Sequence, residues 1–588
     1  MTIIDLHLYL HLRIQTPEMI NKFILIIFLL IFFEGPDKTS ILSPPLDIPL
    51  VLSANFGEPR TGHFHSGVDF KTGGKTGQLV HSAADGYIYR IVVSPTGFGK
   101  ALYIRHNNGL STVYGHLSRF TTEIDEYVKD NQYAKKSFSV NLFPPAGKFK
   151  VNEGELIGYS GNSGSSLGPH LHFEVRRSSI EKPLDPIQFY EIEDNIRPVI
   201  RSVAIYPAGQ SSTVEEKKEK LILRTKGSAG NYTVSKTEPV TISGPVGFGI
   251  NTYDFIDNSW NKCGVRIINL KVDNRLLYSH SIDEFAFSET RYINSHIDYE
   301  EKIKSSSYIQ KTFLDPNNKL SIYNHTINNG IVELRDGKKH EIEISTSDFN
   351  DNYSSVRFYI IADTTFPGIK PEKEGIMMPF GERNQIAHHD IRISFPPNCF
   401  YDTVFFDYRK APTDRTDIYS DIHFVHNKYV PVHQNFDISI KPDNEIKEQY
   451  FDKLCLVYMD DDKPEDLLFA GGKMDDGFIV GSTRDLGLYA IGIDTVPPIL
   501  EPARFSDGAT IMDGSTLKIK MEDDFSGIGD YAGYVDGKWA LFEWDPKNST
   551  LTYIPDPDHI KRGGKHSLVL KATDNRENDT VLKLDFYW

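Results

Sequence analysis

Short runs of alternating apolar and polar residues recur along most of the chain. His340–Ile344 (HEIEI), Leu517–Met521 (LKIKM) and Ser567–Lys571 (SLVLK) follow this period of two, and Asp, Asn and Gly turns bound them. Such alternation is typical of strands with one buried face. Helical spacing stands out in one segment, near Thr122–Gln132. The pattern therefore predicts a mainly β protein.

Three similar segments interrupt the pattern: DNIRP at 194–198, DTTFP at 363–367 and DTVPP at 494–498. In each, a proline follows an aspartate by four positions. Proline removes a donor from a strand ladder and keeps the preceding residue extended, as a joint between domains requires. A chain of 588 residues is also too long for one core. We therefore expect domains at 46–193, 195–362, 366–493 and 497–588.

The last three expected domains share the texture of short strands between turns. This texture is similar to that of immunoglobulin-like β-sandwich domains, most clearly in 195–362 and 497–588, whereas 366–493 is expected only to be a β domain. Two acidic clusters, Asp254–Asn258 (DFIDN) and Asp348–Asn352 (DFNDN), carry ligands that suit Ca²⁺. Such clusters more often form Asx turns at strand ends, and we favour the turns.

The N-terminus holds an apolar run, Phe23–Phe33 (FILIIFLLIFF), which follows Lys22 and ends at Glu34. Eleven residues are too few to span a bilayer comfortably, but they suit the core of a signal peptide. We therefore predict a signal peptide at 1–35, and a start at Met19 would make it more typical. This predicts an exported protein of the periplasm or cell envelope.

Composition narrows the function classes. The net charge is −16, and no nucleic-acid partner is expected. The segment 51–190 is mildly basic, which is compatible with an anionic polymer substrate but also with an ordinary solvated surface. The three cysteines, Cys263, Cys399 and Cys455, lie far apart without a CxxC pair. They support neither a disulfide framework nor a cysteine-type zinc site.

Histidines gather in three motifs of the first expected domain: HSGVD at 65–69, YGHL at 114–117 and GPHLHFEVR at 168–176. In a strand, His170 and His172 would project from one face. His65 and Asp69 can converge on one ion through a turn between them. Because catalytic zinc typically takes three protein ligands and one open position, His170 or His172 would complete the set. Spacing alone does not decide between these two.

These motifs, in this order and with the glycine-rich GNSGSSLG before the last, resemble the signature of M23 (LytM/lysostaphin-type) zinc metallopeptidases of bacterial cell walls. The resemblance covers about 55–190. It implies a small antiparallel β fold with the site in a groove, and cleavage of peptide cross-links or stem peptides in peptidoglycan. It also implies one zinc ion per chain, held by His65, Asp69 and His172. His116 and His170 would activate water and stabilise the oxyanion.

The expected whole is thus a mainly β chain with a small metallopeptidase domain followed by several β-sandwich, Ig-like domains. Peptidoglycan is the expected partner, and the tail domains could contact other envelope proteins. His63 is expected to line the groove rather than bind metal. The segment 123–151 reads as an insertion that could wall the groove.

Two other functions compete with the peptidase. A non-catalytic protein that binds peptidoglycan and activates an amidase typically lacks some ligands, whereas this chain keeps all five positions. A lipoyl- or biotinyl-carrier needs a lysine at a hairpin tip, and Ser160–Ser166 contains none. An HExxH zinc motif fails at His340, because Ile344 replaces its second histidine. We assign structural roles to the remaining histidines considered: His81, His106, His388 and His389.

Overall fold

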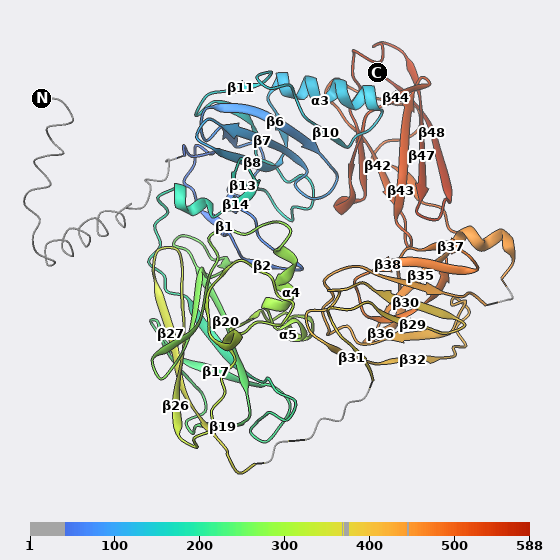
Figure 1. Ribbon diagram of the computed structural model, residues 1–588. Helices are drawn as coiled ribbons and strands as arrows, with labels where there is room; N and C mark the ends of the chain where they lie inside the picture. The colour runs from blue at the N-terminus through green and yellow to red at the C-terminus, as the bar shows by residue number, and fades with distance from the viewer. Residues whose placement is uncertain (1–41, 367–368, 370–374, 444–445) are drawn as a thin grey trace, which may run out of the picture.

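The structure, a computed structural model, describes residues 42–366, 369, 375–443 and 446–588 (Figure 1). The predicted signal peptide and the alternative start at Met19 lie outside these residues. The prediction of a mainly β protein is confirmed, because strands dominate every part of the described chain. Within that part, no helix is both long and apolar enough to cross a membrane.

The first module (52–189) is built on a nine-stranded sheet in the order β1-β4-β13-β8-β7-β6-β10, with β11 and β14 at its sides. A three-stranded sheet, β5-β12-β9, packs beside it. Its elements are β1 (Leu52–Ala54), β2 (Pro59–Arg60), β3 (His63–Phe64), β4 (Val68–Lys71), β5 (Leu79–His81), β6 (Gly86–Val93), β7 (Lys100–His106), β8 (Leu110–Leu117), β9 (Arg119–Phe120), α3 (Thr122–Lys135), β10 (Val140–Leu142), β11 (Lys150–Val151), β12 (Leu156–Tyr159), β13 (His170–Arg177), β14 (Lys182–Leu184) and η1 (Pro186–Phe189).

Alternation along β13 decides which face of the sheet carries polar groups. Leu171, Phe173 and Val175 are fully buried in the apolar core. Because successive strand residues point to opposite faces, His170 and His172 share the other face. The core beneath is aromatic, with the Phe173 ring centroid 5.9 Å from that of Phe70 on β4. A rigid packed layer therefore supports the histidine-bearing face.

The predicted helix is confirmed as α3. Its buried residues Ile124, Val128 and Gln132 recur every four positions and so lie on one face. The helix and the strands β10 and β11 belong to the segment that the sequence marks as an insertion, and β10 and β11 both pair with β6. The two strands of this segment are thus part of the main sheet.

The second module (199–362) forms one 13-stranded sheet, in which β18 and β19 pair in parallel with β27. A β-sandwich has two separate sheets. Here, the parallel pairs with β27 join the strands into one continuous sheet. Its elements are β15 (Val199–Pro207), β16 (Thr213–Val214), β17 (Leu221–Ser228), β18 (Asn231–Val234), β19 (Val240–Ser243), β20 (Val246–Phe255), β21 (Lys262–Cys263), β22 (Ile267–Val272), β23 (Arg275–Ser281), η2 (Thr290–Tyr292), α4 (Ile293–His296), α5 (Tyr299–Ser305), β24 (Ile309–Lys311), β25 (Tyr323–Thr326), η3 (Asn328–Gly330), β26 (Lys339–Ser347) and β27 (Tyr353–Ala362).

The third module (376–493) contains two five-stranded sheets and a two-stranded one, and the fourth (499–587) contains a four-stranded and a five-stranded sheet, each module around its own core. The third contains β28 (Ile376–Met378), β29 (Asn384–Ala387), β30 (Ile391–Phe395), β31 (Val404–Phe406), β32 (Tyr408–Ala411), β33 (Ile422–Val425), β34 (Phe436–Ile440), η4 (Glu448–Lys453), β35 (Leu454–Asp460), β36 (Lys463–Phe469), β37 (Lys473–Asp475), β38 (Phe478–Thr483) and β39 (Gly487–Ile493). The fourth contains β40 (Ile499–Ala503), β41 (Ala509–Thr510), β42 (Leu517–Glu522), β43 (Ile528–Val535), β44 (Lys538–Ala540), β45 (Phe542–Asp545), η5 (Pro546–Asn548), β46 (Thr550–Tyr553), β47 (Lys565–Asp574) and β48 (Asp579–Tyr587). The domain limits given from the sequence, and the Ig-like assignment, remain our proposal.

The chain closes on itself, because the fourth module returns to the first (Figure 1). The ring of Tyr133 on α3 stacks on His559, with centroids 3.5 Å apart. Lys129 on the same helix pairs with Asp556 at 3.0 Å and with Asp558 at 3.2 Å. The inserted helix therefore serves as the docking site for the C-terminal module, a contact that the sequence did not predict.

Phe70→Ala is expected to shift the unfolding of the first module to lower urea concentration. Truncation of a fully buried phenylalanine costs about 3–5 kcal/mol, because it leaves a cavity in the core. Phe143→Ala is the matched control, since Phe143 is 64% exposed and its loss should cost less than about 0.5 kcal/mol. Circular dichroism of the full chain during urea titration measures both, and equal shifts would contradict this account of the core.

Candidate metal and catalytic site

Three neighbouring strands carry most of the predicted site residues. The register of the sheet sets His172 of β13 opposite Asp69 of β4 on one side and opposite Gly115 of β8 on the other. A side chain at Gly115 would meet Cβ of His172 at 3.3 Å, so glycine keeps that side of the histidine open. The strand order alone therefore brings HSGVD, YGHL and HLH to one place.

His116 occupies an irregularity of β8. Leu117 and Tyr114 pair with Lys100 and Leu102 of β7, so two residues of β8 oppose one residue of β7. His116 also has a φ of 58°, which is uncommon outside glycine and is seen most often in turns and functional sites. Such a bulge redirects a side chain from its ordinary place on the strand. It turns His116 toward His170 and His172, with ring centroids at 4.8 and 5.9 Å.

His65, Asp69 and His172 converge on one point. Nε2 of His65 lies 3.1 Å from Oδ1 of Asp69 and 3.1 Å from Nδ1 of His172. Nδ1 of His172 lies 2.9 Å from the same Asp69 oxygen. One atom from each residue thus lies within 4.8 Å of the others, as ligands of a single ion do. Two imidazole nitrogens and one carboxylate oxygen form a donor set that fits zinc.

Hydrogen bonds fix which ring nitrogen of each ligand histidine is free. Nδ1 of His65 donates to the carbonyl of Asn55 at 2.8 Å, which leaves Nε2 with its lone pair. Nε2 of His172 lies 3.0 Å from Oε1 of Glu174, which leaves Nδ1 free. In both rings, the free nitrogen is the one that faces Asp69. This is the arrangement in which outer partners orient metal-binding imidazoles.

The other two predicted histidines are anchored in the same way. Nδ1 of His116 donates to the carbonyl of Ser163 at 2.9 Å, and Nδ1 of His170 donates to the carbonyl of Gly168 at 2.8 Å. Nε2 of His170 is directed at the centre, 3.4 Å from Oδ1 of Asp69. Both rings therefore keep Nε2 available to accept a proton.

The centre is buried, and its charges depend on one another. Burial lowers the pKa of His116 to about 3, so this ring stays neutral near pH 7. Burial also lowers the pKa of His172, but hydrogen bonds to Asp69 and Glu174 raise it to about 9. Burial raises the pKa of Asp69, yet the neighbouring histidines hold it well below its ordinary value. The site thus favours a positive charge between its carboxylates, which a metal cation would provide.

The structure brings all five predicted residues together and sets other histidines apart. His63 is exposed, and its Nδ1 lies 3.0 Å from the carbonyl of Thr61. His81 contacts Asp47 and the carbonyl of Gly154. These positions are in keeping with non-ligand roles.

Comparison with known proteins supports the family resemblance of the first module. The sequence profile of peptidase family M23 matches residues 63–139. The chain contains a peptidase family M23 domain. A second profile, that of the Zu5-like domain, matches residues 376–494 in the third module.

Two relatives and a solved structure illustrate the likeness of the M23 domain. The DD-carboxypeptidase/endopeptidase Mpg of Neisseria meningitidis is 32% identical over 127 residues, which cover 22% of this chain and 23% of Mpg. The peptidoglycan DD-endopeptidase ShyA of Vibrio cholerae is 32% identical over 138 residues, or 22% of this chain and 26% of ShyA. The catalytic domain of lysostaphin from Staphylococcus simulans is 26% identical, with 24% of this chain and 91% of that domain covered and a TM-score of 0.18. The chain therefore spans about a quarter of the length of these two relatives.

The profile match includes His65, Asp69 and His116 but ends before His170 and His172. The fold supplies the connection, because β13 lies between β4 and β8 in the sheet of the M23 domain. The two histidines of β13 thus belong to the same centre as the matched residues.

Several supporting residues of the M23 domain were not predicted. Glu174 shares the strand face of His170 and His172, so the period of two could have identified it. Phe98 stacks on the ring of His172 with centroids 4.6 Å apart. Nη2 of Arg60 donates to Oδ2 of Asp69 at 2.9 Å, which leaves Oδ1 for the histidines. No sequence signal marks Phe98 or Arg60, because only the fold brings them to the site.

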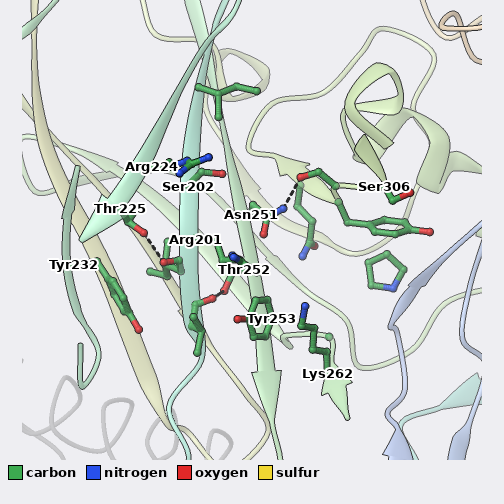
Figure 2. A pocket seen from close by; sticks show the side chains of 18 of the residues that line it. Arg201, Ser202, Arg224, Thr225, Tyr232, Asn251, Thr252, Tyr253, Lys262 and Ser306 are labelled. Atoms are coloured by element: carbon green, nitrogen blue, oxygen red, sulfur yellow. Dashed lines mark hydrogen bonds between the residues drawn. The ribbon is translucent and has the colours of Figure 1, made fainter. Parts of the chain in front are cut away.

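A cavity of about 910 Å³ begins at Glu58 and Pro59 of the first module and extends along the second module. Figure 2 shows side chains of β15, β17 and β20 that line it, among them Arg201, Arg224 and Tyr253. Its lining carries three cationic residues and one acidic residue. The cavity is separate from the five-residue centre, and its charge favours anionic groups.

Glu174→Gln is expected to weaken binding of a divalent metal by about 10–100-fold, because a neutral acceptor orients and polarises His172 less well. Glu181→Gln is the matched control, since Glu181 contacts the same Arg176, at 3.5 Å, but does not contact His172 in the described structure. Isothermal titration calorimetry with ZnCl₂ measures the effect, and equal affinities in both variants would contradict the assigned role of Glu174.

Proposed function

We propose that the chain is an exported zinc metalloendopeptidase that hydrolyses peptide cross-links or stem peptides of peptidoglycan. The convergence of His65, His170 and His172 on Asp69, with His116 beside them, carries this proposal. Each of the four rings has one nitrogen held by an oxygen acceptor and the other free. The M23 domain and the activities for which its two relatives are named, a DD-carboxypeptidase/endopeptidase and a peptidoglycan DD-endopeptidase, support the substrate class. Export is supported by the apolar run of the N-terminus and by the place of peptidoglycan outside the cell membrane.

His65, Asp69 and His172 would hold the metal. When bound, zinc would polarise the scissile carbonyl and acidify water, which is the chemistry that peptide hydrolysis requires. Arg60 supports the carboxylate of Asp69 through its outer oxygen, and Phe98 packs against His172. Residues that do not themselves bind the metal thus hold two of its ligands, Asp69 and His172, in position.

His116 and His170 would move the protons. Because His116 is neutral and its Nδ1–H is held by Ser163, its Nε2 can accept a proton from the attacking water and return it to the leaving amine. The His170 side chain is 18% exposed, compared with 3% for His172, so it lies nearer to an incoming peptide. Once protonated, its Nε2 can donate to the oxyanion that develops on the carbonyl.

His172→Ala is expected to lose both zinc binding and peptidoglycan cleavage, because it removes a ligand. His116→Ala should retain about one zinc but lose about 10²–10⁴-fold in turnover, the contribution typical of acid–base catalysis. His63→Ala is the matched control and should change neither. Metal content by mass spectrometry and muropeptide mapping after digestion of purified peptidoglycan provide the two measurements.

The same experiment separates the peptidase from the amidase activator. A metal-loaded wild-type protein that leaves every muropeptide uncut, yet stimulates a partner amidase, would contradict the peptidase proposal and favour the activator. Retention of zinc by His172→Ala would instead contradict the ligand assignment.

A further inference from the structure

Three aspartates from separate parts of the chain meet where the M23 domain joins the second module. Asp194 lies in the linker after η1, Asp254 lies near the end of β20, and Asp348 follows β26. One carboxylate oxygen from each lies within 4.8 Å of the others. The two acidic clusters that the sequence offered as separate turns are thus brought together, and the linker adds a third carboxylate.

Asp254 adds a second and independent observation. Its side chain is buried, with 2% of the residue exposed, and its Oδ1 has no hydrogen-bond partner among the described residues. A buried ionised carboxylate without a partner is unfavourable, so such groups are normally paired or coordinate a cation. The carboxyl group that carries this oxygen is the one that approaches Asp194 and Asp348, with one of its two oxygens within 4.8 Å of an oxygen of each.

Within the described part of the chain, no lysine, arginine or histidine forms an ion pair with Asp194, Asp254 or Asp348. Burial, and then the other two carboxylates, raise the pKa of Asp254 to about 9. Burial likewise raises the pKa of Asp194 to about 6. The three carboxylates therefore repel one another unless a proton or a cation lies between them.

We propose that Asp194, Asp254 and Asp348 bind one calcium ion at the junction between the M23 domain and the second module. The three donor atoms are all oxygens, which suits a hard cation and not zinc. Oxygens bound to one Ca²⁺ at about 2.3–2.6 Å lie at most about 5 Å apart. The three carboxylate oxygens lie within 4.8 Å of one another, close enough to share one ion. Neighbouring backbone carbonyls and water would complete the six to eight oxygens typical of Ca²⁺.

Hydrogen bonds around the cluster already connect the linker to the module. Nδ2 of Asn352 donates to the carbonyl of Asp194 at 3.0 Å and to Oδ2 of Asp348 at 2.8 Å. Nδ2 of Asn350 donates to the carbonyl of Ile192 at 2.9 Å. A cation bound here would hold the linker against β20 and the loop after β26, and would stiffen the joint.

A second cluster of three aspartates, at the joint between the third and fourth modules, allows a comparison with this one. Asp494, Asp523 and Asp574 form a similar cluster between the third and fourth modules. There, Asp494 accepts from the backbone N–H groups of Val496 and Ser526, and Asp523 accepts from those of Phe525 and Gly527. Unlike Asp254, none of the three has a buried oxygen without a partner among the described residues. This second cluster carries no proposal, and it supplies a control.

The test compares the metal-free full chain with its Asp254→Asn and Asp523→Asn variants. Isothermal titration calorimetry with CaCl₂ should show a site in the wild type with a dissociation constant of about 10⁻⁴–10⁻³ M, typical of extracellular modules. Asp254→Asn should weaken this binding by more than about 10-fold. Asp523→Asn should leave it unchanged. MgCl₂ in place of CaCl₂ distinguishes the two hard cations.

Folding failure is separable from loss of the site. Without calcium, Asp254→Asn should melt at the same temperature as the wild type or higher, because it replaces a buried, unpartnered carboxyl group with an amide that cannot ionise. With calcium, the melting temperature of the wild type should rise while that of Asp254→Asn should not, and proteolysis between residues 191 and 198 should slow only in the wild type. Equal calcium binding by wild type and Asp254→Asn, or none by a folded wild type at millimolar CaCl₂, would overturn the proposal.

Discussion

The candidate site depends on the register between β4, β13 and β8. This pairing sets Asp69, His172 and the bulge of His116 in one row across the sheet. A shift of one residue would turn every side chain of β13 to the other face and bury the histidines in the aromatic core. Leu171, Phe173 and Val175 prevent such a shift, because each is fully buried on the opposite face. The apolar residues of β13 therefore fix the position of its two histidines.

The sequence was informative where chemistry and periodicity coincide. The alternation predicted a mainly β chain, the helix near 122–132 was found, and the three histidine motifs meet in space. Periodicity could not supply the partners that fix each ring, because Asn55, Phe98 and Ser163 reach the site from loops. Nor could it show that the inserted helix docks the C-terminal module, since the contact between Tyr133 and His559 joins residues far apart in the chain.

The two acidic turns illustrate the same limit. Each cluster alone is an ordinary Asx-type turn, and Asp348 does accept hydrogen bonds from Asn352 in that way. Their meaning changes only when the sheet of the second module brings them together beside the linker. Local sequence can therefore predict the turn but not the electrostatic cost of bringing three carboxylates together, two of them buried.

The tail modules also bear directly on the M23 domain. Asn55 donates to the carbonyl of Gly264 and accepts from its N–H, both at 2.8 Å, so the second module clamps the residue whose own carbonyl orients His65. At the opposite side, Nζ of Lys547 in the fourth module contacts the carbonyls of Asn162 and Ser166 in the glycine loop that leads into β13. One ligand histidine and the strand of the other are thus held by different modules. Separating the M23 domain from the later modules would remove both supports, although the isolated domain would still contain every predicted site residue. The geometry of the site therefore depends on the whole chain.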